Sequence, residues 1–333
     1  MLDFGRRSDK ERQEGFQIVA PMMKMNEGII EKDFYVVLIL ELLFHHSKFG
    51  KSFAFKGGTS LSKGYNIIKR FSEDIDLVMD WSLLGLSDVE AWQERSHRQQ
   101  EFFNTRINEE AGQWIEKSLV PELIDCLERE ELQGFHVFVR EEDKQTVIIE
   151  YPKHFTSAGI LPEIRLEIGP LAAWTPVKDR AITSYIAEKL PNVFSEPSTV
   201  IPTVEAKRTF WEKATILHKE ANRRHNFTPK RYSRHYYDLY LLAQSEIKEE
   251  AFADLDLLNR VVAFKEKFYL DNSAKYEEAV PATLKLLPKE EQLEHLRADY
   301  DAMQAMMFEK APSFDEIMQG LAKLEKEIHQ LGV

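Results

Sequence analysis

The sequence lacks the residues and segments that define several classes of protein. Cys126 is the only cysteine among 333 residues, which excludes an intrachain disulfide and a cysteine-rich metal site. The strongest apolar run, FYVVLILELLF at 34–44, is too short to span a bilayer and is interrupted by Glu41. Residues 1–17 are charged and contain no apolar signal core. We therefore expect a protein of the reducing cytoplasm with no membrane segment.

The chain also lacks an excess of positive charge and the common glycine-rich nucleotide motifs. Its formal net charge is −12 and its pI is about 5.4, which argues against a protein that coats nucleic acid non-specifically. Neither G-x-x-x-x-G-K-[ST] nor G-x-G-x-x-G occurs, so the P-loop and the Rossmann fingerprint are excluded. Hydrophobic residues make up 43% of the chain, enough for the sizeable core of a folded protein.

Hydrophobic periodicity predicts both helices and strands and so indicates an α+β fold. Residues 26–46 are predicted to form a buried helix capped by Asn26, and 87–131 a helical region. Strands are predicted at 53–58, 74–79, 135–140, 145–151 and 163–169. Prolines cluster near residue 190, and almost everything beyond is predicted to be helical, including 274–286. We therefore expect an N-terminal helical segment at 1–47 packing on a core at 48–190, and a helical domain at 191–333.

The segment FKGGTSLSKGYNIIKRFSEDIDLVMD at 55–80 carries the clearest chemical signal. Asp74 and Asp76 lie two residues apart on a predicted strand, so both carboxylates project from the same face. Two like charges this close are unfavourable unless a cation neutralises them. Hard oxygen ligands favour Mg²⁺ or Mn²⁺, which complete their shells with water and substrate phosphates. The pair therefore predicts a metal platform for phosphate chemistry.

A further carboxylate and a glycine turn complete this predicted site. Glu167 lies at the centre of the alternating strand EIRLEIG and is a candidate third metal ligand; the alternative is the solvent face of an amphipathic strand. Gly57 and Gly58 allow the backbone to approach a phosphate closely, and the helix expected to open at Thr59 offers backbone N–H groups. Lys63 adds a further polar contact.

The strings EKDFYVV, FKGGTSLSKGY and RFSEDIDL together resemble the AbiEii/AbiGii toxin family of nucleotidyltransferases, within the DNA polymerase beta-type superfamily. The resemblance continues through WEKATILH and RYSRHYYDLYLL and covers about residues 30–245. It implies that 48–190 is a nucleotidyltransferase core with a mixed β-sheet flanked by helices, and that the helical domain forms the other wall of a nucleotide cleft. It further implies that Gly57, Gly58 and Ser72 contact phosphates and that Asp74 and Asp76 bind metal. Lys213 and Asp238 match the family's later lysine and aspartate, and Arg70 and Lys63 lie within the signature as candidate phosphate contacts.

Two of these later positions also have simpler interpretations. Lys213 lies on an apolar helical stripe, where it either extends its charge to water or reaches the triphosphate. Asp238 either pairs with Arg234, one helical turn earlier, or orients Lys213 or an acceptor group.

The segment 207–235 reverses the acidic balance of the chain. It contains nine Lys and Arg residues but only two acids, Glu212 and Glu220. A solvated helix face is the simplest interpretation, and a basic wall for nucleotide phosphates or an RNA acceptor is the alternative. On the second interpretation the candidate acceptor-binding residues are Arg223, Arg224, Lys230 and Arg231.

The predicted function is Mg²⁺- or Mn²⁺-dependent transfer of a nucleoside monophosphate from a nucleoside triphosphate to an acceptor hydroxyl. The family resemblance implies a toxin of a toxin–antitoxin or phage-defence system, with a cognate antitoxin as partner. It also implies RNA as the acceptor, with the 3′ end of tRNA as a candidate. Two alternatives stay open: a nucleotide-binding interaction module without transfer, and an enzyme that modifies a small molecule or a protein hydroxyl.

Overall fold

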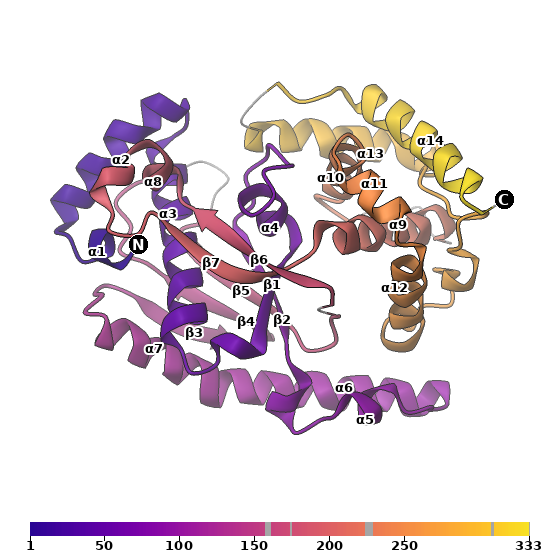
Figure 1. Cartoon of the computed structure of the whole chain (residues 1–333), viewed down its shortest axis with the longest axis horizontal. Helices are drawn as coiled ribbons and strands as arrows, with labels where there is room; N and C mark the ends of the chain where they lie inside the picture. Colours follow the sequence, from indigo (N-terminus) through magenta and orange to yellow (C-terminus); the bar gives the residue numbers. More distant parts are fainter. Residues whose placement is uncertain (157–160, 174, 224–228, 308–309, 333) are drawn as a thin grey trace. The chain divides into compact units, whose positions relative to one another are not determined.

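The computed structural model describes residues 1–156, 161–173, 175–223, 229–307 and 310–332 (Figure 1). The chain forms two compact units. The first comprises 1–64, 72–94 and 102–203, and the second comprises 65–71, 95–101 and 204–333. The unit boundary therefore lies beyond the expected position near 190. Two short segments, 65–71 and 95–101, also belong to the second unit although they interrupt the sequence of the first.

The first unit is built on a seven-stranded sheet with the order β3-β4-β5-β2-β1-β7-β6. Its central strands pair in both senses: β1 runs antiparallel to β2 and parallel to β7, while β2 and β5 are parallel. The edge pairs β3–β4 and β4–β5 are antiparallel. The mixed sheet of an α+β fold is thus confirmed. The strands are β1 (Phe53–Lys56), β2 (Asp74–Met79), β3 (His136–Arg140), β4 (Asp143–Glu150), β5 (Glu163–Gly169), β6 (Val177–Thr183) and β7 (Ser198–Val204).

Strands β6 and β7 were not expected from the sequence. β6 is mostly exposed, so it shows no alternation of apolar residues. β7 contains Pro202, and proline normally argues against an interior strand because it cannot donate to a neighbour. Its buried positions, Thr199, Ile201 and Thr203, nevertheless alternate with half-buried or exposed ones. β7 pairs with β1, and this pairing places 198–203 in the first unit.

Helix α3 (Glu27–Glu41) is the buried helix of the first unit. The Asn26 side chain accepts a hydrogen bond from the Gly28 N–H at 2.8 Å, which confirms the predicted cap. A π-helical turn continues α3 over Leu42–His46, and α3 packs against β5. The other helices that lie wholly or largely in this unit are α1 (Leu2–Gly5), α2 (Asp9–Met23), α4 (Gly57–Lys63), α5 (Asp88–Trp92), α6 (His97–Trp114), α7 (Val120–Arg129) and α8 (Tyr185–Lys189). Among the described residues, no helix has the length and apolar character needed to cross a membrane.

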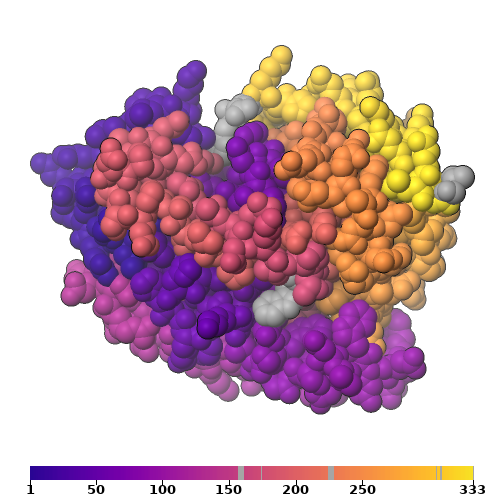
Figure 2. All heavy atoms as spheres, in the orientation of Figure 1, coloured from indigo at the N-terminus to yellow at the C-terminus, as the bar shows by residue number. Residues whose placement is uncertain are grey.

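Helices α5 and α6 contribute to the molecular surface. They form part of the purple band along the lower edge of the space-filling view (Figure 2). Their exposed apolar side chains include Val89 and Phe102, which are 83% and 73% exposed. Single exposed apolar residues of this kind are common on folded proteins.

The second unit is helical, as expected. Its helices are α9 (Ala206–Asn222), α10 (Ser233–Ala243), α11 (Ile247–Phe252), α12 (Leu255–Phe268), α13 (Glu290–Met303) and α14 (Phe314–Gln330). The helix expected at 274–286 is wrong: only Tyr276–Glu278 forms a short 3-10 turn. Lys275 has a left-handed backbone and Pro281 lacks an N–H donor, so a continuous helix is disfavoured there.

Candidate active site

The two aspartates of the D-x-D motif occupy one side of β2. Asp74, Asp76 and the preceding Ser72 are half-buried, whereas the intervening residues Glu73, Ile75 and Leu77 are buried. The parallel register of β2 and β5 pairs Asp74 with Arg165 and Asp76 with Glu167. Paired residues of adjacent strands project to the same face. The sheet therefore places the Glu167 side chain beside that of Asp76, and the Arg165 cation beside Asp74.

Gly57 lies directly against the Asp76 carboxylate. Its backbone is left-handed, with φ +77, and a Cβ atom at this position would lie 1.8 Å from Asp76 Oδ2. Glycine is required here for two independent reasons: only glycine adopts this φ without strain, and any side chain would collide with Asp76. The sequence predicted a phosphate-approach role for this glycine, and the structure adds a contact with the second aspartate.

The short helix α4 connects the glycine turn to the start of β2. It begins at Gly57, two residues earlier than expected. The Thr59 hydroxyl donates to the Asp74 carbonyl oxygen at 2.5 Å, and the Ser60 hydroxyl donates to the Gly57 carbonyl at 2.9 Å. These bonds fix the distance between the glycine turn and the first aspartate.

Lys63, a predicted nucleotide contact, ends α4 in a buried ion pair. Its ammonium lies 2.7 Å from Asp33 Oδ1, and its side chain is only 6% exposed. It also lies 3.6 Å from the centroid of the Tyr185 ring. Lys63 therefore has structural partners within the first unit. Its pairing with a residue of α3 could not be deduced from the local sequence.

The second unit contains a buried cluster formed by three other predicted site residues. Arg70 donates from Nε and Nη2 to the two oxygens of Asp238, both at 2.9 Å. Lys213 Nζ lies 2.8 Å from Asp238 Oδ2. Asp238 therefore contacts Lys213, as required if it orients that lysine, and its role in the reaction stays a prediction. In place of the proposed pairing with Arg234, Asp238 binds Lys213 and both guanidinium donors of Arg70, whose planar fork matches the two carboxylate oxygens.

Burial and charge shift the pKa values of this cluster in a consistent way. Burial alone would raise the pKa of Asp238, but the Arg70 and Lys213 cations hold it well below its ordinary value. Burial lowers the pKa of Lys213, although Asp238 counteracts that effect. His235 Nδ1 lies 3.5 Å from Lys213 Nζ, and burial with the nearby cation lowers its pKa well below 6.5. At neutral pH the cluster therefore contains an aspartate anion and a neutral imidazole.

Several cations of the basic stretch are paired with acids of the second unit. Four of its cations form ion pairs at 2.6 to 3.0 Å: Lys207 with Asp254, Arg208 with Glu212, Lys219 with Asp271 and Arg223 with Glu220. Of the other predicted acceptor contacts, Lys230 and Arg231 are exposed, and Arg224 lies outside the described residues. The pairs with Asp254 and Asp271 could not be deduced from the sequence, because these acids lie far along the chain, whereas Arg208–Glu212 and Arg223–Glu220 are local pairs within the stretch.

No group of three His, Cys, Asp or Glu side chains among the described residues converges closely enough to hold a metal ion unaided. Asp74, Asp76 and Glu167 are therefore near neighbours on adjoining strands and not a preformed three-ligand cage. Such an arrangement is compatible with Mg²⁺, which is commonly held by one or two carboxylates together with water and substrate phosphates.

Comparisons with known proteins identify the family. The family model described as "Nucleotidyl transferase AbiEii toxin, Type IV TA system" matches residues 41–320. No curated protein matches the chain. Among solved structures, the chain is similar to MenT4, a nucleotidyltransferase toxin from Mycobacterium tuberculosis H37Rv, at 16% sequence identity and a TM-score of 0.41, covering 95% of this chain and 97% of that one. Because the family model matches most of the sequence, the chain belongs to the AbiEii nucleotidyltransferase toxins of type IV toxin–antitoxin systems.

Proposed function

We propose that this toxin transfers a nucleoside monophosphate from a nucleoside triphosphate to an acceptor hydroxyl, in a reaction that requires a divalent cation. The observation that carries the proposal is the register of β2 and β5, which sets Asp76 beside Glu167 with Asp74 on the same side. The glycine turn contacts this carboxylate group through Gly57. Phosphoryl-transfer sites need both elements: oxygen ligands for cations and a backbone that admits phosphate.

Asp74 and Asp76 are the residues we propose to hold Mg²⁺ or Mn²⁺, with Glu167 as a third ligand. Their oxygen donors suit hard cations. When bound, such ions neutralise charge on the transferred phosphate and on the leaving pyrophosphate. The position of Gly57 against Asp76 supports a role for this carboxylate that requires a defined orientation.

The other residues of the first unit would bind and orient the nucleotide. We assign phosphate contacts to Gly57, Gly58 and Ser72 and to the backbone N–H of Thr59. The acceptor hydroxyl would attack the α-phosphorus in line with the leaving pyrophosphate, and a site carboxylate would accept its proton. Lys63 stays a predicted phosphate contact, although its ammonium already forms an ion pair with Asp33.

Roles for the second unit follow from the family signature and from the buried cluster. We propose that Lys213 supplies positive charge to the triphosphate, and that Asp238 and Arg70 hold it in place. The Arg70 guanidinium and the Asp238 carboxylate are already engaged with one another, because both Asp238 oxygens accept hydrogen bonds from Arg70. That the second unit forms the other wall of the nucleotide cleft stays a prediction.

RNA is the acceptor that we propose, with the 3′ end of tRNA as the first candidate, and a cognate antitoxin is the proposed protein partner. Of the predicted acceptor contacts, Lys230 and Arg231 are exposed and are the ones we propose to meet a phosphate backbone. Arg223 is a weaker candidate, since its guanidinium pairs with Glu220 at 2.6 Å.

Transfer of radiolabel from each α-labelled nucleoside triphosphate tests the proposal directly. Purified toxin is incubated with Mg²⁺ and with total RNA, total protein or small metabolites in separate reactions. We expect label in RNA of tRNA size, removed by ribonuclease and absent when Mg²⁺ is chelated. Label in protein or in a small molecule would instead identify a different acceptor, and binding of nucleotide without any transfer would indicate an interaction module.

Gly57→Ala is expected to reduce transfer strongly, because the new methyl group would displace the Asp76 carboxylate. Gly85→Ala is a matched control: Gly85 has a similar left-handed backbone, φ +69, but nothing lies within 4 Å of its Cβ position. Both variants should lose roughly 1 kcal/mol of stability from backbone strain. Only Gly57→Ala should lower kcat, by about 100-fold. Equal activities in the two variants would show that glycine is required at position 57 only for its backbone conformation and not for its contact with Asp76.

A further inference from the structure

Helix α3 carries three consecutive charged residues that the proposed reaction does not use. Glu31, Lys32 and Asp33 are 0%, 1% and 3% exposed, within a helix that is buried from Ile30 to Glu41. Successive residues of an α-helix point about 100° apart, so the three side chains reach different neighbours. Burying a charge is costly unless it is paired and hydrogen-bonded. The partners of these residues therefore indicate which segments the helix holds.

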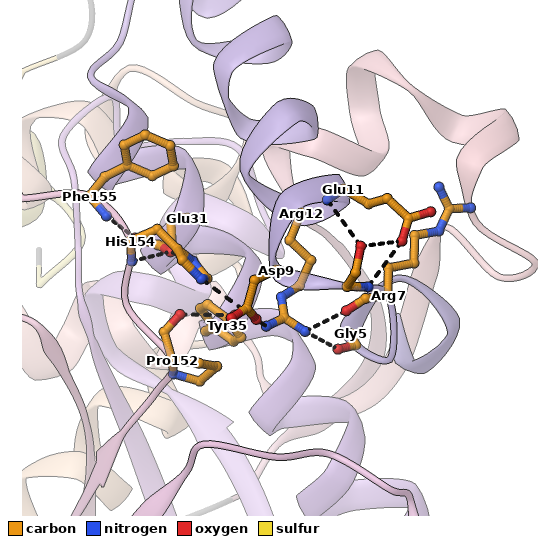
Figure 3. A network of polar contacts seen from close by, with 11 residues as sticks. Gly5, Arg7, Asp9, Glu11, Arg12, Glu31, Tyr35, Pro152, His154 and Phe155 are labelled. Carbon is orange, nitrogen blue, oxygen red and sulfur yellow. Dashed lines mark hydrogen bonds and ion pairs between the residues drawn. The ribbon is translucent and has the colours of Figure 1, made fainter.

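Glu31 holds the segment that follows β4. Its carboxylate accepts hydrogen bonds from the backbone N–H groups of His154 and Phe155 at 2.9 and 3.0 Å (Figure 3). It also lies 2.9 Å from the His154 ring nitrogen Nδ1. On the other side of the ring, Nε2 lies 3.7 Å from Asp9 of helix α2. These contacts connect helices α2 and α3 with the segment that follows β4.

Lys32 holds the residue that precedes the first aspartate. Its ammonium lies 2.6 Å from Glu73 Oε2 and donates to the Leu161 carbonyl at 2.8 Å. Glu73 is 4% exposed and immediately precedes Asp74. Burial lowers the pKa of Lys32, while Glu73 and then Asp74 raise it, so Lys32 is within electrostatic reach of the site. Glu73, the residue directly before β2, is thus bound to helix α3 through Lys32.

Asp33 holds the helix that begins at the glycine turn. Its Oδ1 pairs with Lys63 at 2.7 Å, and its Oδ2 accepts from the Tyr185 N–H at 2.6 Å. Lys63 is the last residue of α4, whose first residue is Gly57. Neighbouring residues of α3 therefore anchor the two segments of the first unit, 57–64 and 72–76, that contain the proposed ligands of cation and phosphate.

We propose that Lys32 and Asp33 are positioning residues of the transferase site. Lys32 acts through Glu73 on Asp74, and Asp33 acts through Lys63 on helix α4. This inference rests on the proposed function of Asp74 and the glycine turn. The competing explanation is that both ion pairs only stabilise the fold. Apolar side chains would then serve as well, since a buried ion pair can often be replaced by well-packed hydrophobic residues without loss of stability.

The double variant Lys32→Met/Glu73→Met separates these explanations. It replaces the pair by apolar side chains of similar length and leaves the net charge unchanged. We expect a melting temperature close to that of the wild type, a kcat lower by about 10–100-fold, and Mn²⁺ binding weaker by about 10-fold. Mn²⁺ binding is measured by electron paramagnetic resonance without nucleotide, so this readout does not depend on turnover.

Lys48→Met/Glu122→Gln is the control. This pair also joins distant segments of the first unit, with Lys48 Nζ 2.8 Å from Glu122 Oε2 and with Glu122 buried. Neither residue adjoins a proposed site residue in the sequence. We expect wild-type kcat and Mn²⁺ binding. If the Lys32→Met/Glu73→Met variant also retains both, the positioning role is overturned and the pair only stabilises the fold.

A second variant keeps the test decisive if the first does not fold. Asp33→Asn/Lys63→Met retains an oxygen for the Tyr185 N–H and again preserves net charge. We expect the same loss of Mn²⁺ binding. Because this binding is measured without nucleotide, the loss cannot be caused by removal of a phosphate contact of Lys63. Unchanged Mn²⁺ binding and kcat would overturn the inference. A wild-type protein that binds Mn²⁺ but transfers nothing would instead contradict the proposed function, while the Mn²⁺ measurement would still test the positioning role.

Discussion

Asp76→Asn is expected to reduce nucleotide transfer on the order of a thousandfold, equivalent to about 4 kcal/mol of transition-state stabilisation. The substitution removes one negative charge but almost no volume, so the contact with Gly57 is preserved. Because Asp76 lies in register with both Lys56 and Glu167, its backbone is held by strands on either side. The fold should therefore survive, and the loss should reflect weaker binding of the cation.

The measurement is Mg²⁺-dependent transfer over a range of metal concentrations, with thermal unfolding as the check on folding. Asp74→Asn should behave in the same way, and Glu167→Gln should also be severe if Glu167 is the third ligand. Glu150→Gln is the matched control, since Glu150 is an exposed carboxylate on strand β4, which pairs with β5. Full Mg²⁺-dependent activity in Asp76→Asn would contradict the two-aspartate proposal. Near-normal activity in Glu167→Gln would show that Glu167 is not a metal ligand and only occupies the solvent face of its strand.

The parts of the site that were predictable from sequence depend on local geometry. Alternation along a strand is fixed by the backbone, so the common side of Asp74 and Asp76 and the outward position of Glu167 follow from their spacing. The strand order and register that set Glu167 beside Asp76 are not local. The structure is needed to show that β5, far along the chain, pairs with β2.

The parts that were not predictable depend on partners distant in sequence. The collision between a side chain at Gly57 and Asp76 requires two segments to approach one another in three dimensions. Similarly, helix α3 contains three consecutive charged residues, Glu31, Lys32 and Asp33, directly before its apolar run from Phe34 to Leu40. These charges indicate buried pairing, but nothing in the local sequence specifies Glu73 or Lys63 as the partners.

The largest effect on stability is expected from Asp238→Asn. The substitution leaves the Arg70 and Lys213 cations buried without the anion that they share. Removing one partner of a buried ion pair typically costs about 3–5 kcal/mol. We expect this loss to appear as faster hydrogen exchange of the amides in α9 and α10, the helices that carry Lys213 and Asp238. Transfer should also fall, because Lys213 would lose its fixed position.

Asp271→Asn provides a matched control in the same unit. Asp271 pairs with Lys219 at 2.9 Å, but the two side chains are 32% and 29% exposed. Its hydrogen bonds with Ser273 and its pairing with Lys219 outweigh burial and lower its pKa to about 2. Solvent screens such a pair, so we expect a loss of at most about 1 kcal/mol. The comparison separates the effect of burial from the effect of removing an Asp–Lys pair.

The pH dependence of stability gives an independent test of the Asp238 cluster. The pKa of Asp238 is depressed in the folded state, so the unfolded chain takes up its proton first as the pH falls. The contribution of Asp238 to stability is therefore complete above its ordinary pKa of 3.8 and is lost progressively at more acidic pH. Asp238→Asn should unfold at lower denaturant concentration at neutral pH and should lose less further stability between pH 5 and 2.5 than the wild type. The contrary outcome is an Asp238→Asn variant that loses transfer but keeps the stability and acid sensitivity of the wild type. Asp238 would then act in the chemistry and not as the anchor of Arg70 and Lys213.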